Sequence, residues 1–307
     1  MRGGEATMAT SGAPGPGIAG EPPDVVRLHV ADRDVAHYVW NPQVAPGSSP
    51  RPYLHPVRTL AGLAVTEAGP DSHRHQFGIS IAAPDIDGTN FWGGRTFVAG
   101  HGPAWLDNHG SQRHQRWLRH TGTELAHTLI WVGSDQRNLL REERSFACRA
   151  LSDTAWTLDT RTRLTNATGE PLTIRSPAAL GRVGAGYGGF FWRGPAITGT
   201  VEILSPLGTG VASVHGHSAD WTAAACTGGE GGDWTVLFAP ADDETARDRW
   251  FVRARDYLGI GSSLTWDRPL VLAPGETIDR HILTVIADGA ASAGSAAELA
   301  AAAGAAA

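Results

Sequence analysis

Two histidines stand one residue apart in the stretch DSHRHQFGISIA, residues 71–82. If residues 73–82 form a strand, His73 and His75 share a face with the apolar side chains that follow, because strand side chains alternate. A neutral imidazole there can exchange protons near neutral pH. The same pair is half of a metal site, which a third ligand such as His55 or an acid would complete. A structural interpretation is also open, with both imidazoles half-exposed and hydrogen-bonded to the backbone.

Histidine is concentrated in the first half of the chain, and tryptophans accompany it. Ten of the 13 histidines precede residue 130. Aromatic faces beside planar polar donors suit a ligand with many hydroxyl groups, because its C–H faces stack on the rings while its hydroxyls bind the donors. The segment TNFW contributes Asn90 and Trp92, and WLDNHG contributes Asp107 and His109. This pattern predicts a sugar-binding cleft; the alternative is an aromatic core with polar loops.

A glycine-rich segment, GRVGAGYGGFFWRG, occupies residues 181–194. It cannot be a regular strand throughout, because glycine weakens strand interiors and marks bulges or close backbone approach. No helical pattern follows it, which disfavours a phosphate-binding loop. We expect it to deliver Arg182, Tyr187 and Arg193 to the cleft, with Trp192 stacking on a sugar ring. The alternative is a bulge held by arginines that pair with nearby acids.

Carboxylates in two segments could take part in acid–base chemistry. The segment ARDYLGIG, residues 254–261, places Asp256 and Tyr257 at the entry of a glycine-rich strand. Asp256 is therefore the leading candidate for a catalytic acid, ahead of the aspartate in WLDNHG. In REERSF, Glu142 and Arg144 stand two residues apart and can pair on a strand face, where such surface pairs contribute little. An ion pair is the favoured interpretation there.

The composition excludes several classes of function. The formal net charge is −6 over 307 residues, so no basic field favours nucleic acid. All 25 cationic side chains are arginine, which excludes lysine Schiff-base chemistry. No stretch approaches about 20 apolar residues, and Gly and Pro interrupt the opening segment where a secretion signal needs an apolar run. We expect a cytoplasmic protein without nucleic-acid or membrane partners. Its two cysteines show no zinc-binding spacing.

The pattern along the chain predicts an all-β fold. Alternating segments are separated by turn residues about every ten positions, and helical periodicity is absent over long stretches. Antiparallel strands in this number usually stack as two sheets, so we predict a large antiparallel β-sandwich over residues 24–288. Residues 1–23 are predicted to be a disordered tail. Residues 289–307 are predicted to be an Ala-rich tail that buries little apolar surface; it could form a short terminal helix, because alanine has the best helix propensity, but such a helix is marginal alone in water. Exposed strand edges make a homodimer a further expectation.

Four segments carry a family resemblance: RPYLHPVRT, DSHRHQFGISIA, GTNFW and RWFVRARDYLGIGSSLTWDRPLVLAPGET. Together they resemble the bacterial PmoA-like family over roughly residues 50–290. In place of the family's DHPHH-like start, this chain has DSHRHQFG, with Arg74 or Gln76 where a histidine is expected. The resemblance implies carbohydrate metabolism on a supersandwich similar to galactose mutarotase. Enzymes of that architecture hold a sugar over a concave sheet, with histidines and acids as proton donors and acceptors. The family is named after a methane oxygenase subunit that is embedded in the membrane. The present sequence shows no apolar segment of the length that crosses a membrane, so we do not expect it to share that function.

These inferences predict a glycoside hydrolase-like enzyme that cleaves or rearranges a small or oligomeric sugar at or near its anomeric centre. The predicted catalytic groups are His73, His75, Asp107, Tyr187 and Asp256. The predicted substrate-binding groups are His55, Asn90, Trp92, His109, Arg182, Trp192, Arg193 and Tyr257. No cofactor is required by this hypothesis. Two alternatives stay open: a non-catalytic sugar-binding protein, and a lyase or oxygenase that uses a divalent metal held by His55, His73 and His75.

Overall fold

Alternation along the long strands places one face of each against a core. In the computed structural model, which describes residues 24–306, the strand Ala155–Asn166 buries Trp156, Leu158 and Leu164 on one side. Arg161 and Arg163 of the same strand are exposed on the other side. This is the period-two pattern of a sheet with one apolar face. The predicted tail over residues 1–23 lies outside the described residues.

The strands form two large sheets in which neighbouring strands run antiparallel. The first sheet has seven strands, in the spatial order β1 (Val25–Val30), β2 (Arg33–Val39), β3 (Tyr53–Val57), β4 (Ile79–Ala82), β13 (Gly189–Arg193), β19 (Leu258–Ser263) and β18 (Arg249–Ala254). The second has nine strands, in the order β15 (Gly208–Thr209), β14 (Thr200–Ser205), β16 (Thr222–Thr227), β17 (Trp234–Pro240), β21 (Thr277–Asp288), β11 (Ala155–Asn166), β10 (Asn138–Ala150), β9 (Glu124–Val132) and β8 (Ser111–His120).

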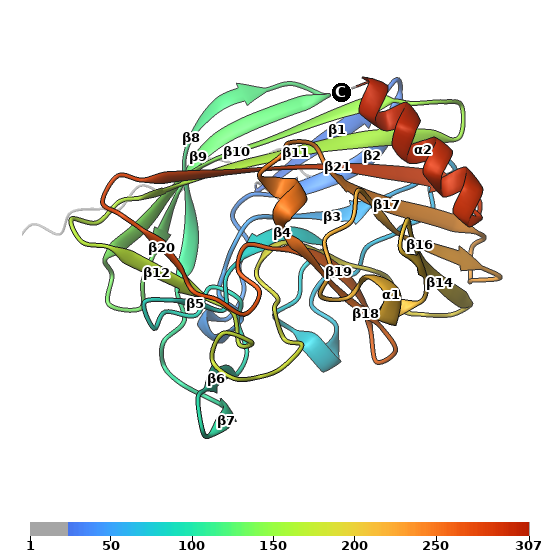
Figure 1. The fold of residues 1–307 in the computed structure, drawn as a ribbon. Helices are drawn as coiled ribbons and strands as arrows, with labels where there is room; N and C mark the ends of the chain where they lie inside the picture. The colour runs from blue at the N-terminus through green and yellow to red at the C-terminus, as the bar shows by residue number, and fades with distance from the viewer. Residues whose placement is uncertain (1–23, 307) are drawn as a thin grey trace, which may run out of the picture.

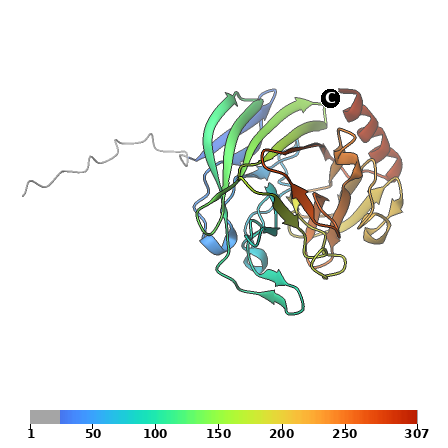
Figure 2. The ribbon, with the colours of Figure 1, turned by 60° about the vertical axis from the view of Figure 1, so that its left-hand side comes forward.

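Short elements complete the fold. Two small sheets pair β20 (Leu270–Leu272), β12 (Leu172–Arg175) and β5 (Asp85–Ile86), and β6 (Thr96–Val98) with β7 (Gly102–Ala104). The hairpin of β6 and β7 projects from one edge of the molecule (Figures 1 and 2). The helical elements are η1 (Pro46–Ser48), η2 (Asp71–His73), α1 (Val211–Val214), η3 (Thr245–Arg247) and α2 (Ala293–Ala306). Within the described part of the chain, no helix is long and apolar enough to span a membrane.

The two large sheets face each other across one hydrophobic core. Trp192 of the seven-stranded sheet contacts Trp234 and Phe238 of the nine-stranded sheet, with ring centroids 6.2 and 5.4 Å apart. Burial of these large rings stabilises the stacking of the sheets, because the hydrophobic free energy grows with the apolar area removed from water. The predicted all-β antiparallel sandwich is confirmed.

The Ala-rich end forms the terminal helix that its composition allows, α2 over Ala293–Ala306, and this helix packs on the outer face of the nine-stranded sheet instead of extending as a tail (Figures 1 and 2). Ala296 and Ala303 are buried against a cluster that includes Leu283 and Val285 of β21. An Ala-rich helix is marginal alone in water. Here its small side chains let the helix approach the sheet closely, and burial supplies the missing stabilisation.

The predicted Glu142–Arg144 pair forms, but in the core instead of on the surface. The Arg144 Nε lies 2.7 Å from the Glu142 carboxylate, and both side chains are fully buried. Trp131 Nε1 and Thr162 Oγ1 each donate to the same carboxylate at 2.7 Å. Arg144 also donates to the Gln112 side chain at 2.8 Å. Hydrogen bonds from several strands therefore satisfy a buried ion pair between the sheets.

Candidate functional site

A cavity of about 690 Å³ lies on the outer face of the seven-stranded sheet. We call it the histidine cavity, because His73 and His75 are part of its lining. Strand alternation creates its floor: in β13, Phe190 and Trp192 point into the core, whereas Phe191 points outward. Phe191 packs there with Phe251 of β18 and with Trp92 from a covering loop. The outer face of this sheet is thus apolar at its centre and is closed over by loops.

Groups from distant parts of the chain meet in this cavity. Its lining includes the predicted site residues His73, His75, Trp92, Arg182, Tyr187, Asp256 and Tyr257. The histidines come from the η2 turn, the arginine and first tyrosine from the glycine-rich segment, and the last two residues from the turn between β18 and β19. The sequence hypothesis that imidazoles, indole ring and glycine-loop arginine share one hollow therefore holds for these residues.

The two histidines reach the cavity by a different route from the one predicted. The expected strand over residues 73–82 begins only at Ile79, and residues 71–73 form a 3-10 turn. Pro70 and the polar residues after it favour a turn over an extended start. The alternation argument therefore does not apply to His73 and His75. Their ring centroids nevertheless lie 6.0 Å apart in the same cavity.

His75 has the chemistry of a neutral proton acceptor. Burial, together with the nearby cation Arg51 and the imidazoles of His73 and His109, lowers its pKa to about 3. Within the described residues, neither of its ring nitrogens has a hydrogen-bond partner, although the residue is only half-buried and lines the cavity. Burial also lowers the pKa of His73. Both imidazoles are therefore neutral at pH 7, and His75 is free to bind a ligand.

The loop around Gly94 fixes the position of the His75 ring. Gly94 has φ +70°, and a Cβ there would lie 2.8 Å from Nδ1 and Cε1 of His75. We expect Gly94→Ala to displace the imidazole and to lower the free energy of unfolding by about 1 to 3 kcal/mol, through overpacking and backbone strain. Urea unfolding and the imidazole NMR signals of His75 measure these effects.

Gly100→Ala is the matched control, because Gly100 has φ +74° and no heavy atom within 4 Å of the new Cβ. This variant carries the backbone strain without the contact. Equal loss of stability in both variants, with unshifted His75 signals in Gly94→Ala, would show that the ring is not held by this loop.

Two phenols line the same cavity, one beside an imidazole and one beside an indole ring. The Tyr257 ring is 4.9 Å from His73, and the Tyr187 ring is 4.6 Å from Trp92, between centroids. Burial raises the pKa of Tyr187 to about 12, and it also raises the pKa of Tyr257. Both phenols are therefore protonated at neutral pH. They can donate a hydrogen bond or a proton, but they cannot act as bases.

Two predicted ligand-binding residues lie behind the cavity. Trp192 is 0% exposed, and its Nε1 donates to the Val65 carbonyl at 2.9 Å, so the stacking role predicted for it is wrong. Strand alternation turns this ring into the core. Arg193 points outward but is buried, binding the Glu67 carboxylate at 2.8 Å and the Gln76 Oε1 at 2.9 Å. Its guanidinium lies 4.8 Å from the Tyr257 ring centre, so it supports cavity residues from below.

Asn90 and His109 hold the covering loop and do not line the cavity. The Asn90 Oδ1 accepts hydrogen bonds of 2.8 Å from the backbone N–H groups of Trp92 and Gly93. His109 Nε2 lies 2.7 Å from the Gly94 carbonyl and donates to it. Their polar groups are occupied by the backbone, which corrects the prediction that they bind substrate directly. Trp92 lines the cavity but is only 5% exposed. Its ring therefore forms part of the cavity floor and does not offer an open face on which a sugar could stack.

His55 and Asp107 lie outside the cavity lining. The His55 Nδ1 is 3.0 Å from Thr66 Oγ1, and Asp107 is exposed on the loop after β7. The predicted role of Asp107 as an acid, and that of His55 as a substrate ligand, are therefore corrected. No group of three or more His, Cys, Asp or Glu side chains among residues 24–306 is arranged to hold a metal ion. The proposed triad of His55 with the two cavity histidines is thus not assembled.

Several lining residues escaped the sequence analysis, namely Gln76, Arg95, Trp105, Phe251 and Arg253. Trp105 is 64% exposed and is the open aromatic face that was expected at Trp92. Arg253 could have been found from the sequence, because strand alternation puts it on the same face of β18 as Phe251, just before Asp256. Trp105 had no such signal, because its position depends on how the loop folds back.

Fold and site together define an antiparallel β-sandwich protein with a cavity lined by imidazoles, phenols and guanidinium groups. Residues 25–301 match the model of a family of unknown function, DUF6807, and the chain belongs to that family. No curated protein matches its sequence.

Three solved structures show distant similarity. The α-galactosidase from Lactobacillus brevis has a TM-score of 0.44 at 11% identity, covering 87% of this chain and 39% of its own. A polysaccharide lyase has a TM-score of 0.36 at 11% identity, covering 80% of this chain and 32% of its own. The heparan sulfate lyase HepC from Pedobacter heparinus has a TM-score of 0.26 at 8% identity, covering 59% and 22%. The chain thus spans about two fifths or less of these proteins.

Proposed function

We propose that the histidine cavity binds a saccharide and that His75 transfers a proton at or near its anomeric centre. One observation carries this proposal: a neutral, half-buried imidazole whose ring nitrogens have no protein partner among the described residues faces a cavity with phenol and guanidinium donors. A general base must be in its neutral form and able to reach the substrate proton, and a pKa near 3 makes this imidazole a weaker base than a free histidine. The resemblance to the PmoA-like family points to the same class of substrate.

The surrounding groups suggest a division of roles. The protonated phenols of Tyr187 and Tyr257 serve as proton donors or hydrogen-bond donors to sugar oxygens. Asp256 is exposed at the edge of the cavity, and its charge opposes the lowering of the His73 pKa. The other acid of the lining, Asp71, is paired with Arg74 at 2.8 Å. Acid–base chemistry in this cavity therefore falls mainly on histidine and tyrosine, with Asp256 in support.

The test is a search for product and for binding with the same protein. The full chain is incubated with a panel of aryl glycosides, oligosaccharides and free sugars, and products are detected by chromatography and mass spectrometry. Calorimetry measures binding of the same compounds. Turnover supports the proposal. Tight binding without product on prolonged incubation favours the non-catalytic sugar-binding protein, and the absence of both refutes the saccharide assignment.

The pH dependence of the reaction should reflect the depressed pKa of the base. Because His75 accepts a proton only in its neutral form, kcat/KM should fall as the pH drops through its pKa, which burial lowers from 6.5 to about 3. We therefore expect kcat/KM to stay level from pH 7 to about pH 4 and to fall to half near pH 3. A pH–rate profile with an acidic limb centred near pH 6.5 would contradict the assignment of this imidazole as the base.

Trp105 should contribute stacking affinity. Its exposed ring lines the cavity, and aromatic stacking contributes about 0.5 to 1.5 kcal/mol beyond area burial. We expect Trp105→Ala to weaken saccharide binding about 3- to 10-fold, with Trp105→Phe retaining most of the affinity. Calorimetry checks this. Equal affinity of the wild-type and alanine proteins would place the sugar away from this ring.

A further inference from the structure

The histidine cavity is positively charged in a chain that is negative overall. Its lining holds four arginines, Arg74, Arg95, Arg182 and Arg253, against two aspartates, Asp71 and Asp256. With neutral histidines this amounts to a formal charge of +2, while the whole chain carries −6. A wall of one sign around a cavity concentrates ligands of the opposite sign.

One arginine of the lining is held in a fixed orientation without a carboxylate. The Arg253 Nη1 donates to the Val252 carbonyl at 2.9 Å, and its Nη2 donates to the Gly184 carbonyl at 3.2 Å. The guanidinium also lies 4.5 Å from the Phe251 ring centre. These contacts fix the group, and no carboxylate among residues 24–306 compensates its charge. Arg95 and Arg182 likewise have no carboxylate partner in the described part of the chain.

A further uncompensated cation lies directly behind the cavity. Arg51 is 0% exposed and donates to the carbonyls of His75 at 2.8 Å and Trp92 at 3.0 Å, both of which line the cavity. Its remaining bonds go to the Ser48 and Ser49 carbonyls and the Ser80 hydroxyl. Burial lowers its pKa to about 9, so it is still protonated at pH 7. Placing a cation in the interior is unfavourable unless an opposite charge approaches it.

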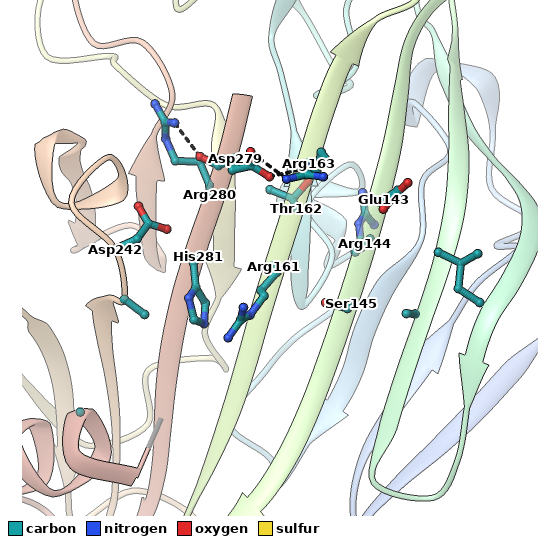
Figure 3. A pocket seen from close by; sticks show the side chains of 14 residues that line it. Glu143, Arg144, Ser145, Arg161, Thr162, Arg163, Asp242, Asp279, Arg280 and His281 are labelled. Atoms are coloured by element: carbon teal, nitrogen blue, oxygen red, sulfur yellow. Dashed lines mark hydrogen bonds and ion pairs between the residues drawn. The ribbon is translucent and has the colours of Figure 1, made fainter. Parts of the chain in front are cut away.

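A second cavity shows the usual arrangement. It has a volume of about 780 Å³ on the outer face of the nine-stranded sheet (Figure 3). Each of its arginines that faces solvent or a loop is paired with a carboxylate: Arg161 with Asp159 at 3.2 Å, Arg163 with Asp279 at 2.8 Å, and Arg280 with Asp248 at 2.7 Å. Its charges are therefore balanced internally. The histidine cavity lacks this balance around Arg253 and Arg51.

We propose that the saccharide bound in the histidine cavity is acidic, and that its anionic group supplies the missing counter-charge by binding Arg253, with Arg182 and Arg95 beside it. Guanidinium groups bind carboxylate and phosphate oxygens in pairs, which gives orientation as well as affinity. The positive charge of Arg51 reinforces this attraction from behind. The proposal rests on the proposed function and adds the chemical class of the sugar.

Binding of matched acidic and neutral sugars to the full chain tests this. Calorimetry compares D-glucuronate with D-glucose, D-galacturonate with D-galactose, and D-glucose 6-phosphate with D-glucose, at low and high NaCl. We expect at least one acidic sugar to bind 10-fold or more tightly than its neutral counterpart, and the difference to shrink in high salt. A preference for the uronates identifies a carboxylate as the group recognised, and a preference for the phosphate ester identifies a phosphate.

Variants show whether the cavity is responsible. Arg253→Gln should lose most of the preference for the acidic sugar, measured as the ratio of its affinity to that of the neutral sugar, and Arg253→Lys should restore part of it. Arg163→Gln, in the second cavity, is the control and should leave the preference intact. Equal affinity for acidic and neutral sugars overturns the inference but leaves the proposed function standing. Binding of neither kind overturns both, and a preference that survives Arg253→Gln refutes the role of this arginine.

Discussion

Replacing His75 by glutamine is expected to lower kcat/KM for the saccharide substrate by about 100-fold, the lower end of the usual contribution of a positioned general base, because its depressed pKa makes the imidazole a weak base. Glutamine keeps much of the size and polarity of the imidazole but cannot take up a proton at neutral pH. The imidazole lies against Gly94 in the cavity, and its nitrogens bind no other group of the described chain. The loss should therefore be in turnover, with substrate binding changed much less. Steady-state kinetics and calorimetry separate the two.

The control for this prediction is His101→Gln. His101 is exposed and does not line the cavity, so its replacement should leave kcat/KM unchanged. Thermal unfolding of both variants verifies that the fold is intact. Full activity in His75→Gln would remove this residue from the mechanism and leave His73 or a phenol as the proton carrier.

Replacing Arg144 by methionine is expected to destabilise the protein by about 3 to 5 kcal/mol, the usual effect of breaking a buried ion pair from one side. The variant leaves the carboxylate of Glu142 buried, with only its bonds from Trp131 and Thr162. It also removes the bridge to Gln112, which itself donates to the Ile81 carbonyl of the opposite sheet at 2.8 Å. Denaturant unfolding followed by tryptophan fluorescence measures the change.

Two comparisons sharpen this experiment. Arg163→Met removes an exposed partner of Asp279 and should cost no more than about 1 kcal/mol. The double variant Glu142→Leu with Arg144→Met should recover part of the lost stability, because no unpaired charge is left in the core. A loss of less than 1 kcal/mol in Arg144→Met alone would mean that water reaches the carboxylate and that the network is not a structural link between the sheets.

The candidate site was predictable where neighbouring residues act together. His73 and His75 are close in sequence, and so are Asp256 and Tyr257. When one residue of such a pair lines the cavity, the other is necessarily near it. The glycine-rich segment was predictable as a shaped loop, and it does deliver Arg182 and Tyr187.

The same segment also shows where prediction failed. Trp192 and Phe191 are adjacent large aromatic residues, and which of them faces the core depends on how the strand pairs with its neighbours. In the structure Phe191 lies opposite Ser80 and Gly261, on the outer face. A strand shifted by one residue would exchange the two rings. Local sequence carries no information on that choice.

The sequence by itself determined the all-β class, because alternation of apolar and polar residues is a local property that each strand expresses alone. It also determined the kinds of groups that could do chemistry. Only the tertiary structure decided that His55, Asn90, Asp107 and His109 stay outside the cavity while Trp105 enters it. It likewise decided that Glu142 and Arg144 pair in the core and that the Ala-rich end packs as a helix. The physical reason is the same in each case: burial and charge compensation depend on segments far away in the chain, and these meet only when the sheets stack.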